Sequence, residues 1–221
     1  MKNSRIILVA LVMMISASTV VCAAPYVAVN MGAVLLNDSD YTDSGYYDGY
    51  SFTEKGEFSF DTGFGVTAAI GNDFRNGFRA EIEFGFRGND IDDADGTYSE
   101  YFPNGDLDFT VDYTGGFRGE VYSSSLMFNG FIDLVPNGTV SPFIGAGVGF
   151  ANIDADLDYY GSEDDNVFAY QFAAGMAFAV TPNMKIDLQY RYFATEDPDF
   201  YSLEAEYDTH NILVGLRSTF Y

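Results

Sequence analysis

Residues 78–87 read FRAEIEFGFR, and apolar and polar side chains alternate along the whole stretch. One parity is apolar and consists of Phe78, Ala80, Ile82, Phe84 and Phe86. The other parity consists of Arg79, Glu81, Glu83, Gly85 and Arg87. Successive side chains of a β-strand point to opposite faces, so the pattern predicts a strand with one apolar and one charged face. The fold depends on which of these two faces meets water.

The same alternation recurs in seven further segments, while no stretch after residue 25 has a convincing helical period. These segments cover about 26–37, 58–71, 122–134, 144–150, 168–178, 185–192 and 211–220. Together with 78–87 they predict an all-β chain of eight strands. Strands of roughly ten residues are long enough to cross a bilayer at a tilt.

The connections between these strands alternate between long and short. Long connections span about 37–57, 89–117, 154–166 and 195–207, and the short ones are NDFRNG (72–77), VPNGTV (135–140) and TPNM (181–184). Both ends of the chain fall on the side of the short turns. Long loops are uncommon inside a compact domain, but they are typical of one side of a membrane β-barrel whose other side has tight turns.

Two architectures produce this alternation, because a soluble sandwich buries its apolar face whereas a membrane barrel turns that face toward lipid. The residues of the second face separate them. In this chain they are mainly Gly, Ala, Ser and Asn, which fit the crowded interior of an eight-stranded barrel. We therefore predict a closed antiparallel barrel with apolar residues outside. Aromatic girdles are predicted from Tyr26, Phe78 and Phe220 at the turn side and from Phe58, Phe86 and Tyr192 at the loop side.

Most of the basic residues lie on the face assigned to the barrel interior, close to acidic ones. The predicted charged residues of the lumen are Arg79, Glu81, Glu83, Arg87, Asp133, Lys185, Asp187, Arg191 and Arg217. A buried charge requires a partner. The pattern thus predicts a network of ion pairs and hydrogen bonds that closes the lumen. The alternative is solvated surface charge on a sandwich.

The N-terminus has the features of a secretory signal peptide: a basic start, an uncharged apolar run and a small-residue site at Val21-Cys22-Ala23. Cleavage after Ala23 gives a signal peptide of residues 1–23 and a barrel domain of residues 24–221. The alternative is a retained membrane anchor. Cys22 is the only cysteine, so the mature chain is expected to contain neither disulfides nor a reactive thiol.

Removal of the signal peptide leaves eight basic residues against 33 acidic ones, a formal net charge of −25. Such a charge disfavours nucleic acid as a partner. No second apolar run has the length of a membrane helix. The mature protein is expected to be exported, acidic and without a helical anchor.

Five segments together resemble the small OmpA-like outer-membrane β-barrels, especially the opacity-type surface antigens. They are RAEIEFGFR (79–87), SLMFNGFIDL (125–134), SPFIGAGVGFA (141–151), FAYQFAAGMAFAVTPNMKIDLQYRY (168–192) and HNILVGLRSTF (210–220). The resemblance implies a location in the bacterial outer membrane, contact with its lipid and insertion by the β-barrel assembly machinery. Gly215 and Phe220 resemble the C-terminal signal that this machinery reads, although Ser218 and the additional Tyr221 depart from it.

Candidate chemistry is sparse, and no catalytic, cofactor-binding or metal site is predicted. His210 is the only histidine, and residue 212, where a His-x-Ser pair would place its serine, is Ile. The Asp-rich stretches IDDADGTYSEYF (91–102) and DADLDYYGSEDD (154–165) each lack residues that a calcium loop requires. We interpret His210 as an interfacial structural residue and the acids as a solvated surface.

The long connections are rich in Asp and Tyr, a composition suited to adaptable recognition surfaces. DLDFTVDYTGGFRGEVY (106–122) alternates around Gly115-Gly116 and is expected to form a hairpin beyond the membrane. The predicted function is an envelope protein whose loops adhere to a surface or recognise an extracellular ligand. The alternatives are a narrow channel for small solutes or ions and a lipid-modifying enzyme.

Overall fold

The computed structural model describes residues 23–115, 119–136, 138–157, 161–200, 203–204 and 206–220, and its regular elements are all strands. The predicted signal peptide, apart from Ala23, lies outside these residues, as do Cys22, Asp158 and Tyr221. No helix in the described part of the chain is long and apolar enough to cross a membrane.

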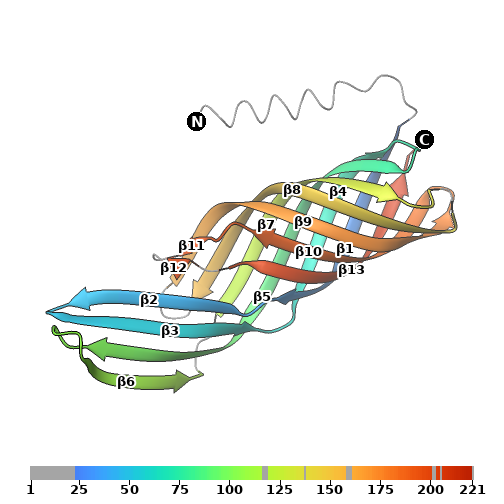
Figure 1. The fold of residues 1–221 in the computed structure, drawn as a ribbon. Helices are drawn as coiled ribbons and strands as arrows, with labels where there is room; N and C mark the ends of the chain where they lie inside the picture. The colour runs from blue at the N-terminus through green and yellow to red at the C-terminus, as the bar shows by residue number, and fades with distance from the viewer. Residues whose placement is uncertain are drawn as a thin grey trace, which may run out of the picture.

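Eight antiparallel strands close into a barrel (Figure 1), which confirms the predicted fold. They are β1 (Ala24–Leu36), β4 (Gly63–Asp73), β5 (Phe78–Tyr101), β7 (Gly119–Asp133), β8 (Val140–Leu157), β9 (Gly161–Thr181), β10 (Met184–Thr195) and β13 (Asp208–Thr219). Each pairs with the next in this order, and β1 pairs with β13 to close the ring. The strand start at Ala24 and the strand end at Thr219 lie together at the end with the short turns.

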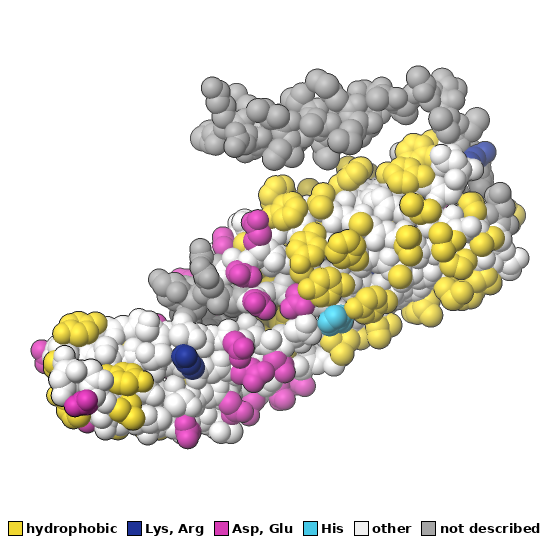
Figure 2. Space-filling model, in the orientation of Figure 1, with side chains coloured by type: hydrophobic (Ala, Val, Ile, Leu, Met, Phe, Trp, Pro, Cys, Tyr) yellow, Lys and Arg dark blue, Asp and Glu magenta, His cyan; other side chains and the backbone are white. Residues whose placement is uncertain are grey.

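The two faces of the barrel wall have opposite character. Val29, Met31 and Val214 on the outer face are 47%, 61% and 52% exposed, whereas Asn30 and Arg217 on the inner face are each 3% exposed. Figure 2 shows hydrophobic side chains spread over the barrel surface. Large apolar side chains outside and charged ones inside are the reverse of a soluble protein and suit a wall in contact with lipid.

A second sheet projects from the loop end of the barrel (Figure 1). The first two long connections are regular here, because they contain β2 (Ser39–Tyr47), β3 (Tyr50–Phe60) and β6 (Leu107–Thr114). These strands and the last residues of β5 pair in the order β2-β3-β5-β6. We call them, with residues 93–101 of β5, the projecting sheet. In the fourth connection, β11 (Asp199–Phe200) pairs with β12 (Leu203–Glu204).

The hairpin that contains β6 differs from the predicted one. β6 pairs with β5 through a turn at residues 102–106, and Gly115 lies after β6 rather than at a hairpin tip. The prediction around Gly115-Gly116 was therefore wrong. The chain turns instead at Pro103-Asn104-Gly105-Asp106. This turn is favoured because Gly105 adopts a φ of 87° and the Asn104 side chain accepts a hydrogen bond from the Asp106 amide.

The predicted second strand, 58–71, is two strands separated at Asp61 and Thr62. Phe58 and Phe60 belong to β3 and pack against a buried apolar cluster at the loop end of the lumen. Tyr26 points into the barrel and is 2% exposed. These three residues therefore do not face lipid, which corrects the predicted girdle positions of Phe58 and Tyr26. Phe78 and Phe220 are exposed on the outer wall.

Candidate functional site

At the turn end of the lumen, two arginines share two aspartates. Arg79 donates to both carboxylate oxygens of Asp133 at 2.9–3.1 Å. Arg217 donates two bonds of 3.0 Å to Asp187, and its other terminal nitrogen lies 3.9 Å from Asp133. The Arg79 guanidinium also lies 4.6 Å from the ring centre of Phe131. The two ion pairs thus form one connected group across four strands, β5, β7, β10 and β13.

In the middle of the lumen, two neighbouring glutamates of β5 have different partners. Arg191 donates to Glu83 at 2.6 Å, and Gln171 donates to the same carboxylate at 3.2 Å. Glu81 instead accepts bonds from the Tyr26 hydroxyl at 2.7 Å and from Asn129 at 3.2 Å. Each carboxylate therefore has donors from other strands, as burial requires.

Toward the loop end, Arg87 forms no ion pair with any residue that the structure describes. Its guanidinium carbon lies 3.8 Å from the ring centre of Phe193, a cation–π distance. It donates to the Asn211 side chain at 3.1 Å and to the Ser125 hydroxyl at 3.2 Å. Beyond it lies a cluster of buried apolar side chains that includes Leu36, Ile91, Val121, Ile153 and Phe193.

Of the nine predicted lumen charges, the structure brings eight together in the interior. They are Arg79, Arg87, Arg191 and Arg217 against Glu81, Glu83, Asp133 and Asp187, each at most 5% exposed. Lys185 shares their face but is only partly buried, and among the described residues no ion pair includes it. Four arginines against four carboxylates leave the buried group without net charge.

Sequence reasoning missed the neutral members of this network. Tyr26, Asn30, Asn129, Gln171, Gln189 and Asn211 are all buried and hydrogen-bonded to it or to one another. For all of these except Tyr26, which was predicted to lie in a lipid-facing girdle, parity on the strands was a usable signal, because each lies on the face assigned to the interior. The predicted network consisted of charged residues alone.

The side chains fill most of the space at the level of the ion pairs. A cavity of about 10 Å³ lies among Arg79, Glu81, Asp187, Arg191 and Arg217. This volume is at the lower limit for a single water molecule. The arrangement suits a plugged lumen rather than a water-filled one.

The two predicted assembly-signal residues occupy different environments. Gly215 faces the lumen, where a Cβ atom would meet the Asn30 side chain and the carbonyl oxygen of Val29 at 2.9 Å. Phe220 is 51% exposed on the outer wall, and its amide donates to the Pro25 carbonyl at 2.8 Å. Gly215 is therefore also required by packing inside the barrel.

His210 lies on the outer wall at the loop end of β13. Its Nδ1 atom is 2.6 Å from the Tyr190 hydroxyl, and its Nε2 atom is 3.4 Å from the Asn37 side chain. The ring stacks on Tyr190 at 5.9 Å and lies 5.4 Å from Tyr192. Neither hydrogen-bond partner is a serine. The surroundings suit the interfacial role that was predicted for this residue.

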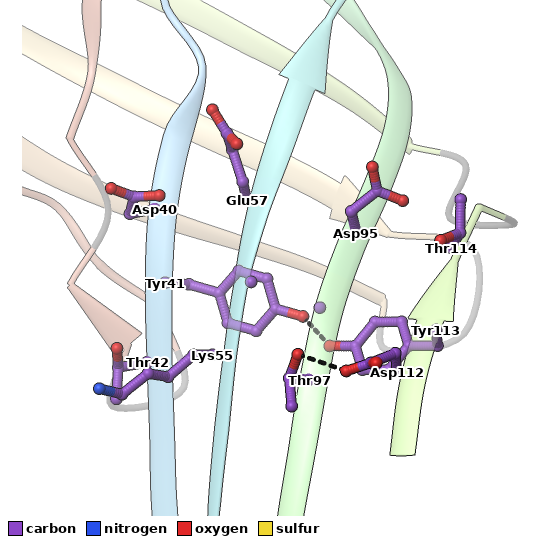
Figure 3. A pocket seen from close by; sticks show the side chains of 12 residues that line it. Asp40, Tyr41, Thr42, Lys55, Glu57, Asp95, Thr97, Asp112, Tyr113 and Thr114 are labelled. Atoms are coloured by element: carbon purple, nitrogen blue, oxygen red, sulfur yellow. Dashed lines mark hydrogen bonds between the residues drawn. The ribbon is translucent and has the colours of Figure 1, made fainter. Parts of the chain in front are cut away.

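The projecting sheet has one aromatic face and one face of hydroxyl and acidic groups. Paired positions run across its four strands as Tyr41, Gly56, Gly96 and Tyr113. Both tyrosine rings lie over these glycines, where a Cβ atom would stand 2.6 Å from Tyr41 and 2.5 Å from Tyr113. Their hydroxyls are hydrogen-bonded to each other (Figure 3). Both hydroxyls are also bonded to Glu54. Burial and the hydrogen bond to Glu54 raise the pKa of Tyr113.

Farther from the barrel, the aromatic face continues around a second carboxylate. Glu100 accepts bonds from Tyr47 at 2.7 Å and from Tyr98 at 3.2 Å. The Tyr98 ring in turn stacks on Phe52, and its centre lies 5.9 Å from the ring centre of Phe109. The hydrogen bond to Glu100 raises the pKa of the Tyr47 hydroxyl to about 12.

A shallow, open depression of about 630 Å³ crosses the projecting sheet at the level of the paired tyrosines. Figure 3 shows its lining, with acidic side chains on one side of the tyrosines and Thr97, bonded to Asp112 at 2.8 Å, on the other. The lining contains Asp40, Glu57, Asp95 and Asp112 and a single base, Lys55. Within the described ranges, no group of three or more His, Cys, Asp or Glu side chains is arranged to hold a metal ion.

Comparisons with known proteins give results that agree with one another. A family model described as the outer membrane protein beta-barrel domain matches residues 7–220. Outer membrane protein PagN of Salmonella typhimurium is 25% identical over 182 residues, which cover 71% of this chain and 73% of PagN. The crystal structure of Neisserial surface protein A is similar with a TM-score of 0.53 at 17% identity, covering 90% of this chain and 99% of that one. OprG of Pseudomonas aeruginosa is similar with a TM-score of 0.51 at 12% identity, covering 90% and 96%.

Proposed function

Because the chain belongs to the outer membrane protein beta-barrel domain family, we propose that it is a surface-exposed binding protein whose projecting sheet recognises an extracellular ligand. The bacterial outer membrane is its location, in agreement with its relatives. The turn end then faces the periplasm and the projecting sheet faces the outside, as is usual for barrels with long connections at one end.

The order within the projecting sheet is the observation that carries this proposal. β5 is a single strand of 24 residues that begins in the barrel wall and ends in the projecting sheet, so the barrel supports the sheet directly. Its two hairpins are joined by pairing between β3 and β5, and aromatic rings cover one face. Rigid aromatic surfaces with polar groups between them are typical of recognition sites, because they bind at a small cost in conformational entropy.

The alternative function, a narrow channel, is disfavoured by the side chains that fill the lumen. Conduction would require ion pairs such as Arg79–Asp133 and Arg191–Glu83 to separate. The apolar cluster at the loop end of the lumen would also have to open. Breaking a buried ion pair by removing one partner costs about 3–5 kcal/mol. We therefore expect no stable conductance steps from the refolded protein in planar lipid bilayers.

A trimmed variant tests the proposal. Residues 39–60 and 94–114 are each replaced by a short Gly-Ser turn, and cells with the full or the trimmed barrel are compared for attachment to immobilised extracellular proteins. We expect cells with the full chain to attach to at least one of these proteins. Attachment of cells with the trimmed barrel should be at least tenfold weaker. Equal attachment by both, or stable conductance by the full chain, would overturn the proposal.

Lipid contact and assembly by the β-barrel assembly machinery are part of the same proposal. The exposed apolar belt supports contact with acyl chains. Phe220 supports recognition by the assembly machinery, because it is exposed directly after β13, at the turn end of the barrel. Replacement of Phe220 by Ala should lower the amount of folded barrel in the outer membrane without changing the stability of barrels that do fold.

A further inference from the structure

β6 is an open edge of the projecting sheet. Among the described residues it pairs with β5 alone, and seven of its eight residues are exposed. In an antiparallel pair, alternate residues of an edge strand turn their N–H and C=O groups away from the sheet. β6 therefore presents main-chain donors and acceptors along one side, and these are the groups that an added strand would bind.

The side chains of β6 divide by parity into two unlike rows. Phe109 and Val111 are 43% and 50% exposed and continue the aromatic face, opposite Glu100 and Tyr98 of β5. Thr110 and Asp112 pair with Ser99 and Thr97 and lie on the opposite face, and Asp108 is the extra residue of a bulge in this pairing. An added strand would thus meet apolar contacts on one face and carboxylates on the other.

The segment that forms this edge, residues 89–115, carries only negative charges. No lysine or arginine occurs from residue 89 to residue 115, whereas eight acidic residues do. Thr97 bonds to Asp112, but a hydroxyl donor does not neutralise a carboxylate. The edge accordingly matches a strand that carries lysine or arginine at alternate positions.

We propose that β6 binds an extended polypeptide segment in which apolar residues alternate with lysine or arginine, and that this segment adds to the projecting sheet as a fifth strand. The proposal rests on the proposed function and names its ligand class. Main-chain hydrogen bonds would supply affinity, and the alternating side chains would supply specificity. The cations would lie on the face of Asp112, with the apolar residues against Phe109 and Val111.

A second copy of the chain fits this edge less well. Antiparallel pairing of two β6 strands around Thr110 would place Asp108 of each copy directly opposite Asp112 of the other. Like charges directly opposite each other in a sheet are destabilising. The formal charge of −25 on each mature chain adds repulsion at longer range.

The test uses the refolded full chain in detergent and an eight-residue synthetic peptide of alternating Val and Lys. A peptide of the same sequence with N-methyl groups at alternate residues keeps the charge but cannot form the strand bonds. We expect the N-methylated peptide to bind at least tenfold more weakly. Equal binding of both peptides would overturn the proposal, because it would show adsorption by charge alone.

Charge reversal locates the site. D108K/D112K should weaken binding of the Val-Lys peptide at least tenfold and favour a peptide of alternating Val and Glu. D38K/D43K makes the same change in net charge at and just before β2, at the other edge of the sheet and outside the depression, and should leave binding within twofold. Proteolysis of each variant checks that the projecting sheet is folded. An equal loss in both variants would overturn the proposal.

The outcome also separates this proposal from the one on which it rests. If trimmed cells lose attachment but the Val-Lys peptide binds no better than its N-methylated form, recognition by the sheet stands and the β6 proposal is wrong. If trimmed cells attach normally, both are wrong. A dimer of the full chain that D108K/D112K abolishes would identify a second copy as the occupant and overturn the choice of ligand.

Discussion

The hydroxyl groups of Tyr41 and Tyr113, which come from the two edge strands of the projecting sheet, are hydrogen-bonded to each other above its two central strands. The two rings reach that far because Gly56 and Gly96 leave the space beneath them empty. Aromatic rings that cover strand glycines are a known means of stabilising sheets. The contact ties the β2–β3 hairpin to the β5–β6 hairpin, so we expect the two to fold as one unit.

Replacement of Gly96 by Ala should release the projecting sheet. The new Cβ atom would lie 2.5 Å from Cζ of Tyr113 and 3.0 Å from the Lys55 carbonyl oxygen, so the ring must move. We expect protease cleavage within residues 39–60 and 94–114 to become at least tenfold faster in the folded protein, with the barrel intact. Tyr113→Phe keeps the ring and removes the hydroxyl, so its effect should be smaller. Cleavage of Gly96→Ala at the wild-type rate would contradict the role assigned to the contact.

The Tyr47–Glu100 hydrogen bond predicts a pH dependence at the tip of the sheet. The pKa of Tyr47 is raised to about 12, so its neutral form is favoured in the folded protein. The stability that this bond adds is complete below pH 10, the ordinary pKa, and is lost as pH rises through about 12. Ultraviolet difference titration against Tyr47→Phe should show one phenol ionising near pH 12, and Glu100→Gln should move it toward 10. A Tyr47 titration near 10 in the wild-type protein would be evidence against the bond.

The ion pair between Arg191 and Glu83 predicts a non-additive response to mutation. Arg191→Met leaves Glu83 buried without its cation and should lower the free energy of unfolding by about 3–5 kcal/mol. Glu83→Gln in the same chain should restore much of that loss, because no uncompensated charge remains. The measurement is equilibrium unfolding in urea of barrels refolded in lipid vesicles. Additive effects of the two substitutions would show that the residues do not interact.

The outer wall predicts a penalty for charge in the middle of the barrel belt. Val214 is 52% exposed and lies between Met31 of β1 and Leu188 of β10. Val214→Arg should cost about 2–4 kcal/mol of stability in lipid vesicles. Val214→Leu, the matched control, should cost less than about 1 kcal/mol, since it keeps an apolar surface toward acyl chains. Equal costs would argue against lipid at this face.

Much of the barrel was predictable because its rule is local. A two-residue period with apolar and small or charged faces, as in 78–87, indicates strand and face at once. The interior position of charged residues such as Arg79 and Asp133 could be predicted from parity. The ion pair between them could not, because it depends on the register of two strands whose paired residues are 54 positions apart in the sequence.

The projecting sheet was not predictable in the same way. Its strands contain several Gly and Asp residues, which are weak strand formers, and they are stabilised by contacts between distant residues such as Tyr41 and Tyr113. Two turn signals also competed in one segment, and Pro103-Asn104-Gly105-Asp106 was preferred over Gly115-Gly116. A bulge where Ser59 and Phe60 pair with Asp93 and Ile91 then shifts the parity of β5, which no periodic pattern reveals.

The reversed polarity of the barrel wall is the claim on which the rest depends, and a label scan along β13 tests it most directly. Single cysteines at residues 212, 213, 214 and 216 would carry a spin label in lipid vesicles, with collisions measured against oxygen and a water-soluble nickel complex. Labels at Ile212, Val214 and Leu216 should be accessible to oxygen alone, as expected for side chains in acyl chains. The label at Leu213, which is 1% exposed in the lumen, should be shielded from both reagents. Equal accessibility at both parities, or contact of the even positions with the nickel complex, would contradict the account.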